Sequence, residues 1–179
     1  MIGPAIRRGL LANFPTGTPL AVVAPDGAFD DVVADRNDPL TTIHASPSGV
    51  PATSPNVIVE GLDAVADPRG LLVALRATTP AARLFALVAN AAHLPALAAY
   101  FAGAAIAPAR PLVRADIERL IAGTGWNVFA IESIASDVPF APPPVPGPVQ
   151  VGALTFTLAD AATLERVTPA AFLAIADPI

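Results

Sequence analysis

The sequence predicts a doubly wound α/β fold, in which one mostly parallel sheet lies between two layers of helices. Three short apolar runs, at 56–59, 84–89 and 127–134, are separated by segments whose apolar residues recur at helical spacing. Strands that alternate with helices in this way build a parallel sheet with helices on both faces. A chain of 179 residues suits one domain with a substantial core, so we expect a single domain over residues 1–179.

The N-terminal elements follow from apolar spacing and from turn residues. Residues 4–13 place Ile6, Leu10 and Leu11 on one side and Arg7 and Arg8 on the other, which predicts an amphipathic helix that caps one edge of the sheet. Apolar residues 20–24, which end at a Pro-Asp-Gly turn, predict a buried strand. A short helix over 29–36 and a second strand over 41–45 follow.

The central region gives the clearest pattern. Asp67 followed by Pro68 predicts a helix N-terminus, because the carboxylate caps free amides and proline suits the first helical position. Residues 84–89 predict a strand and 92–102 a helix. A further amphipathic helix should end at Gly123 or Gly125, and residues 126–134 return as a strand.

The C-terminal third begins with a proline-rich segment. Residues 137–150 hold six prolines and are expected to be extended and unpaired. They predict either a covering loop between strands or, as an alternative, a polyproline ligand for a partner protein over residues 139–148. Residues 152–158 alternate as a strand does, Asp160 caps a short helix over 160–167, and 171–176 form the last strand.

Composition excludes several function classes. A net charge of −5 and a pI near 4.8 provide no basic footprint, so nucleic acid is not expected as a partner. The absence of cysteine excludes disulfides and thiolate sites. Residues 84–109 carry no formal charge, but Asn90, His93 and Pro95 interrupt the run, so no membrane span is expected. No targeting segment is predicted, and the expected location is the cytoplasm.

Residues 56–134 resemble the C-terminal half of class I S-adenosylmethionine (SAM)-dependent methyltransferases, especially the bacterial branch related to ubiquinone and sugar-linked enzymes. The family's fourth strand runs into an acidic, Leu-Glu-His and Asp-Pro segment, which corresponds here to Glu60, Leu62, Asp63, Ala64, Asp67 and Pro68. The Asn-x-x-His that usually follows the fifth strand corresponds to Asn90 and His93. The resemblance implies a Rossmann-like methyltransferase sheet with an antiparallel last strand and SAM as the cofactor.

The N-terminal half departs from the family pattern. A glycine-rich turn should follow the first strand, but this turn reads Ala-Pro-Asp-Gly-Ala-Phe and has one glycine and a proline without an amide donor. Ser46 and Pro47 stand where a carboxylate should hold the ribose. Only 31 residues separate Ala24 from Asn56, too few for two more strands and three crossovers. We therefore expect a truncated sheet of about six strands with a weak or absent SAM site.

Candidate site residues lie where strands end, because open α/β sheets bind ligands at that edge. Asp26, Gly27, Glu60 and Asp63 are candidates for holding the cofactor, and the alternative for Glu60 and Asp63 is a solvated turn with a helix-capping role. Asn90 is the candidate for binding substrate. His93 could act as a general base, although a histidine bonded to backbone at a helix start is the commoner case. Two isolated histidines without a carboxylate cluster predict no metal site.

These observations predict a methyltransferase-like domain with a degenerate SAM site that acts as a non-catalytic binding or structural module. Its partner would be a small molecule or a protein, and its apolar surface suggests self-association into a homo-oligomer. One alternative is an active SAM-dependent methyltransferase that acts on a small molecule or sugar. The other is a protein-interaction module that uses the proline-rich segment 139–148.

Overall fold

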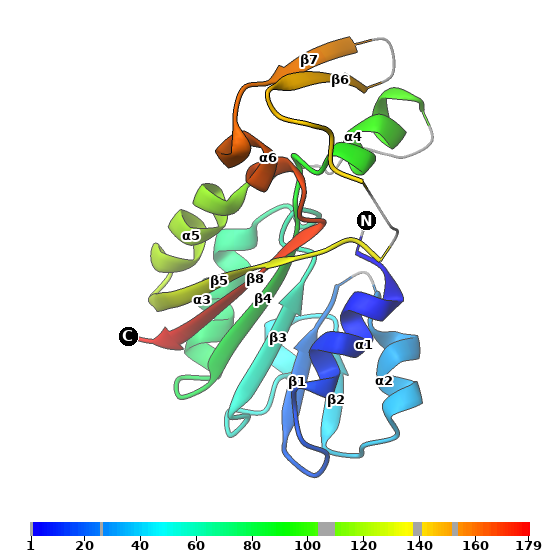
Figure 1. The fold of residues 1–179 in the computed structure, drawn as a ribbon. Helices are drawn as coiled ribbons and strands as arrows, with labels where there is room; N and C mark the ends of the chain where they lie inside the picture. Colours follow the sequence, from blue (N-terminus) through cyan, green and yellow to red (C-terminus); the bar gives the residue numbers. More distant parts are fainter. Residues whose placement is uncertain (1, 26, 104–109, 138–140, 152–153) are drawn as a thin grey trace.

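A computed structural model describes residues 2–25, 27–103, 110–137, 141–151 and 154–179. Strands and helices alternate along most of the chain (Figure 1). In chain order they are α1 (Pro4–Ala12), β1 (Leu20–Val23), α2 (Asp30–Arg36), β2 (Thr41–His44), the short 3-10 helix η1 (Pro47–Gly49), β3 (Asn56–Glu60), α3 (Pro68–Thr78), β4 (Arg83–Ala89), α4 (Leu94–Phe101), α5 (Arg114–Ala122), β5 (Trp126–Ile134), β6 (Gly147–Val151), β7 (Leu154–Leu158), α6 (Ala161–Val167) and β8 (Ala171–Pro178).

The central sheet has six strands in the order β2-β1-β3-β4-β8-β5. Neighbouring strands from β2 to β4 are parallel, whereas β8 runs antiparallel to both β4 and β5. The predicted six-stranded sheet with an antiparallel last strand is therefore confirmed. Between β2 and β3 the chain forms only η1 and loop, so the strand–helix unit predicted to be missing is absent from this described stretch.

Helices cover both faces of the sheet, which makes the predicted three layers. Alternate strand residues point to opposite faces, so Ala21 and Val23 pack with α3 and α5, whereas Leu20 and Val22 pack with α1 and α2. The loop that contains η1 packs against α3 and contributes Val50 to the core on that side. The expectation that the first helix caps an edge of the sheet is wrong: α1 buries Ile6, Leu10 and Leu11 against a face.

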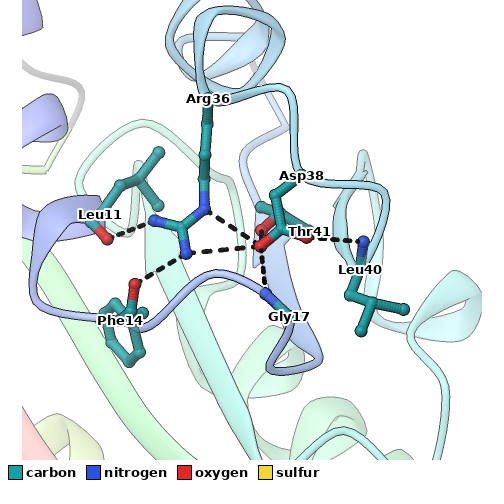
Figure 2. Close-up of polar contacts among 7 residues, drawn as sticks. All are labelled: Leu11, Phe14, Gly17, Arg36, Asp38, Leu40 and Thr41. Atoms are coloured by element: carbon teal, nitrogen blue, oxygen red, sulfur yellow. Dashed lines mark hydrogen bonds and ion pairs between the residues drawn. The ribbon is translucent and has the colours of Figure 1, made fainter.

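A buried network ties the layers together at the edge where β1 and β2 begin (Figure 2). Arg36, at the end of α2, donates to the carbonyl of Leu11, in the last turn of α1, and to that of Phe14, just beyond α1. Its Nε lies 3.4 Å from an Asp38 carboxylate oxygen. Asp38 in turn accepts hydrogen bonds from the amides of Gly17 and Leu40 and from the Thr41 hydroxyl. This network, at what we call the amino edge of the sheet, therefore holds α1, α2 and β2 in place relative to one another.

A small cap lies beyond the opposite, carboxyl edge of the sheet, at the top of Figure 1. We use the word cap for α4, α6 and the antiparallel hairpin β6–β7, which has its own apolar cluster centred on Leu94, Val151 and Leu158. The prediction that 137–150 is unpaired is wrong for its last four residues, because Gly147 to Gln150 lie in β6 and pair with β7. Residues 154–158 form the predicted strand, but they pair in this hairpin and not in the central sheet.

Three predicted helix boundaries are confirmed. Asp67 accepts a hydrogen bond from the Gly70 amide at 2.8 Å and Asp160 from the Thr163 amide at 2.7 Å, so both carboxylates cap their helices as expected. Gly125 has a φ of +86° and supplies the left-handed stop after α5. Among the described residues, no helix is long and apolar enough to cross a membrane.

Candidate functional site

The carboxyl edge of the sheet carries most of the predicted site residues. Glu60 is the last residue of β3, and it is buried with only 5% of its surface exposed. Arg7 of α1 reaches across to it: Arg7 Nε donates to Glu60 Oε2 at 2.9 Å, and Arg7 Nη2 donates to Glu60 Oε1. The guanidinium carbon also lies 5.7 Å from the centre of the Phe29 ring, which is fully buried. The Glu60 carboxylate thus forms a two-point ion pair within the chain.

Arg7 is the site residue that the sequence prediction missed. Its helical spacing opposite Ile6 and Leu10 predicted a solvated position, yet its side chain is only 13% exposed. Arg8 fits that expectation, since it makes an exposed ion pair with Asp35 at 3.2 Å. No sequence signal separates the two arginines, because the position of Arg7 depends on how α1 is placed over β3.

The turn after β1 is closed by its own backbone bonds. The Gly27 amide donates to the Ala24 carbonyl at 3.1 Å, and the Gly27 carbonyl accepts from Asp30. Gly27 has a φ of +71°, and a Cβ there would lie 3.1 Å from the Asp30 carboxylate, so glycine is required at this position. Asp26, the other candidate in this turn, lies outside the described residues.

Asp63 lies in the loop between β3 and α3, where it is half-buried. Its carbonyl accepts from the Arg110 amide at 3.1 Å, and the Arg110 side chain donates to the Ala66 carbonyl. Beside this loop, a pocket of about 200 Å³ is lined by Pro25, Gly61, Ala64 and Val65. Its lining residues lie in the loops that follow β1 and β3, the strands whose ends carry the predicted cofactor residues.

Asn90 follows β4 and is almost fully buried, and all of its side-chain polar atoms are engaged. Its amide nitrogen donates to the carbonyls of Arg166 and Pro169, each at 2.9 Å, and its amide oxygen accepts from the Ala92 amide at 3.0 Å. Asn90 thereby holds the end of α6 and the segment that follows it at the end of β4. This arrangement assigns it a positioning role between the cap and the sheet.

His93 precedes α4 and is buried, with 5% of its surface exposed. Its backbone amide donates to the Asn90 carbonyl at 3.1 Å, and its carbonyl accepts from Leu97. Burial lowers the pKa of its imidazole below the ordinary value of 6.5, which favours the neutral ring at pH 7. His93 is not among the described residues that line either of the two cavities reported in this section.

The second cavity is a groove of about 1130 Å³ between the cap and the sheet. Its walls are the first turn of α5 and most of α6, and its apolar lining includes Val113, Leu164, Val167 and Phe172. Charged side chains of both signs line it as well, namely Arg114, Glu118, Glu165 and Arg166. Asn90 lines this groove, whereas Glu60, Asp63 and Gly27 do not, so neither of the two cavities brings the described candidate residues together.

Two other features bear on cofactor binding: groups of potential metal ligands and the side chains at the end of β2. Among the described residues, no group of three or more His, Cys, Asp or Glu side chains could hold a metal ion. After β2, where the resemblance implies a ribose-binding carboxylate, the side chains of Ser46 and Ser48 hydrogen-bond to each other at 2.9 Å, in an exposed position. His44, the last residue of β2, contacts Thr42, and burial lowers the pKa of its imidazole.

The amino-acid sequence matches no protein-family model and no curated protein. Solved structures do match. A SAM-dependent methyltransferase from Archaeoglobus fulgidus superposes with a TM-score of 0.60 at 11% identity, over 98% of this chain and 94% of that chain. One from Mesorhizobium loti gives a TM-score of 0.55 at 11% identity, over 98% of both chains.

A third match comes from the complex between the Haloferax volcanii Trm112 methyltransferase activator and the putative methyltransferase. It has a TM-score of 0.55 at 15% identity, over 97% of this chain and 77% of that chain. Other matched proteins are longer: this chain spans 53% of the methyltransferase CalO6 and 46% of LaPhzM. Identities this low establish a shared fold, and the activity of each protein still depends on its own site.

Proposed function

We propose, from the premise that this chain has the class I SAM-dependent methyltransferase-like fold, that it is a non-catalytic binding module. The observation that carries the proposal is the Arg7–Glu60 pair, which occupies the end of β3 with side chains of the chain itself. Ligands of open α/β sheets lie outside the carboxyl ends of the strands. A cofactor at this edge would have to share its place with a guanidinium that is already bound to the nearest carboxylate.

The residues around the end of β1 support the same proposal. Ligand pockets for drug-sized molecules measure about 300 to 1,000 Å³, whereas the pocket beside Pro25 and Gly61 measures about 200 Å³. The Gly27 amide, which the resemblance would direct at the cofactor, already donates to Ala24. The described residues therefore fit SAM poorly, and we derive no methyl-transfer step for them.

Calorimetric titration with SAM and with S-adenosylhomocysteine tests this proposal. We expect no micromolar binding of either compound, because the described pocket at this edge is small and the Gly27 amide is already bound to the Ala24 carbonyl. A SAM-dependent methyltransferase from the same fold, titrated in parallel, serves as the positive control. Micromolar affinity for either compound would overturn the non-catalytic proposal and favour the alternative, an active methyltransferase.

We place the binding function in the groove between α5 and α6. This groove is large enough for a small-molecule ligand, has apolar side chains in its lining, and lies between two separately packed parts of the chain, where ligand sites are common. The mixture of charged residues around it suits a mostly apolar molecule with a polar end. Asn90 would act by holding α6 in place, since its own polar atoms are engaged.

A fluorescent apolar anion, 8-anilinonaphthalene-1-sulfonate, provides a probe for the groove. Ala115 lies on α5 in the groove lining, so Ala115→Trp should fill the groove and reduce dye binding several-fold. Ala122 is exposed on the same helix and is not part of that lining, so Ala122→Trp is the matched control. Equal dye binding by both variants would contradict the proposal that the groove is the binding site.

A further inference from the structure

The hairpin of the cap differs from the rest of the molecule in its charge. Residues 138–159 contain no Asp, Glu, Lys or Arg, and neither does the run 84–109 that includes α4. All ten arginines and all fifteen carboxylates, and thus the whole net charge of −5, lie outside these two segments. Two copies of the chain repel each other least where these uncharged segments meet.

One face of the hairpin is apolar, and it extends beyond the cover that α4 provides. Val151 pairs with Leu154 and Val149 with Phe156, so these four side chains share a face with Leu158. Val151 and Leu158 are buried against Leu94 of α4, but Leu154 remains 44% exposed and Phe156 42% exposed. The same face therefore carries both the contact with α4 and an uncovered apolar edge.

The two strands of the hairpin differ in how readily each could pair with another strand. β6 contains Pro148, which cannot donate a backbone hydrogen bond and therefore discourages further pairing, and it lies next to α4. β7 has the sequence LTFTL, without proline or charge, and its first four residues are exposed. A five-residue strand rich in β-branched and aromatic residues is suited to pair with another strand.

A two-stranded hairpin is only marginally stable by itself in water, and three or more strands or a packed helix are needed. Here α4 packs against β6, and α6 packs with Leu158 at the end of β7, so the first four residues of β7 are the less supported part of the hairpin. Another strand along β7 would extend the sheet and cover Phe156 and Leu154. Because β7 is uncharged and its apolar residues alternate about Phe156, a second β7 in antiparallel orientation meets these requirements.

We propose that the chain forms a two-fold symmetric homodimer in which β7 of one copy pairs antiparallel with β7 of the other. The two hairpins then form one four-stranded sheet. Phe156 of each copy lies next to Phe156 of the other at the two-fold axis, and the apolar face of the sheet is continuous across the interface. An uncharged, aromatic centre is typical of interface cores.

Introduced cysteines test this arrangement, since the natural chain has none. In an antiparallel pair centred on residue 156, that residue alone faces its own copy, so Phe156→Cys should oxidise to a covalent dimer that thiols reverse. Val73 is similarly exposed on α3, at 49%, and Val73→Cys is the matched control that should stay monomeric on a non-reducing gel. Equal cross-linking of both variants would overturn the proposed interface.

Light scattering of the unmodified protein gives a test that is independent of the cysteines. We expect a mass of twice 18.1 kDa, which Phe156→Arg reduces to that of a monomer because two like charges would meet at the axis. Val73→Arg should remain dimeric, and circular dichroism should show that both variants are folded. A monomeric natural chain, or a dimer that Phe156→Arg leaves intact, would overturn the proposal. Neither result depends on whether SAM binds.

Discussion

The two edges of the central sheet each hold a buried pair of arginine and carboxylate, but the pairs are built differently. At the amino edge, Arg36 Nε lies 3.4 Å from Asp38 Oδ2. The other hydrogen bonds of these two side chains go mostly to backbone groups at the end of α1 and in the α1–β1 and α2–β2 connections (Figure 2). At the carboxyl edge, Arg7 and Glu60 bond directly to each other at two points.

This difference bears on function. The amino-edge pair closes loops at the edge of the sheet that does not carry ligands in α/β folds, so a structural role accounts for it. The carboxyl-edge pair closes no loop, and it joins residues 53 positions apart at the place where such folds bind ligands. The ion pair holds α1 against the end of β3, and the proposed non-catalytic function rests on this contact.

The largest effect is expected from breaking the carboxyl-edge pair. Arg7→Ala leaves Glu60 buried without its guanidinium, which should lower the free energy of unfolding by about 3 to 5 kcal/mol in urea denaturation. Replacing both partners, as Arg7→Met with Glu60→Leu, should restore most of that loss, because apolar pairs of similar volume often replace buried ion pairs. A double variant as unstable as Arg7→Ala would show that the pair itself is required for folding.

A smaller effect is expected where the cap joins the sheet. Asn90→Ala removes three hydrogen bonds to backbone groups and should lower the free energy of unfolding by about 1 to 3 kcal/mol. The loss should be local, so hydrogen exchange should accelerate in α6 more than in α3. Uniform acceleration over both helices would mean that the cap does not open separately from the core.

The amino-edge network should give a pH-dependent effect. Hydrogen bonds from the Leu40 and Gly17 amides, together with Arg36 and Thr41, lower the pKa of Asp38 below 3.8. Its contribution to stability is therefore complete above pH 3.8 and is lost as the pH falls through the lower folded pKa. Thermal unfolding of Asp38→Asn should vary less with pH in this acid range than that of the natural chain, and an unchanged acid profile would contradict the assignment.

The smallest effect is expected at Arg8, the neighbour of Arg7 in α1. Its pair with Asp35 is exposed on both sides, so Arg8→Ala should change the free energy of unfolding by about 1 kcal/mol or less. Urea denaturation beside Arg7→Ala makes this the matched control for the first prediction. Losses of similar size in the two variants would mean that burial of the Arg7–Glu60 pair has little energetic consequence.

Much of the fold could be predicted because it depends on local pattern. Apolar runs of strand length, the Asp67 and Asp160 caps and the glycine after α5 specify where elements begin and end. The short stretch between Ala24 and Asn56 predicted that a strand–helix unit is missing between β1 and β3. Pairing was less predictable. Residues 147–151 contain Pro148 and resemble a loop in sequence, yet they form β6 and pair with the alternating apolar residues of β7.

For the candidate site too, the sequence predicted some features and the tertiary structure determined others. The sequence alone placed Glu60, Asn90 and His93 at strand ends, because parallel strands bring their carboxyl ends to one edge whatever the details of packing. Only the tertiary structure determined what each side chain contacts: Glu60 binds Arg7, and Asn90 binds backbone carbonyls 76 and 79 residues further along the chain. The physical reason is that helical spacing fixes which face of α1 carries Arg7, whereas the packing of that helix over the sheet decides which of its polar residues is buried.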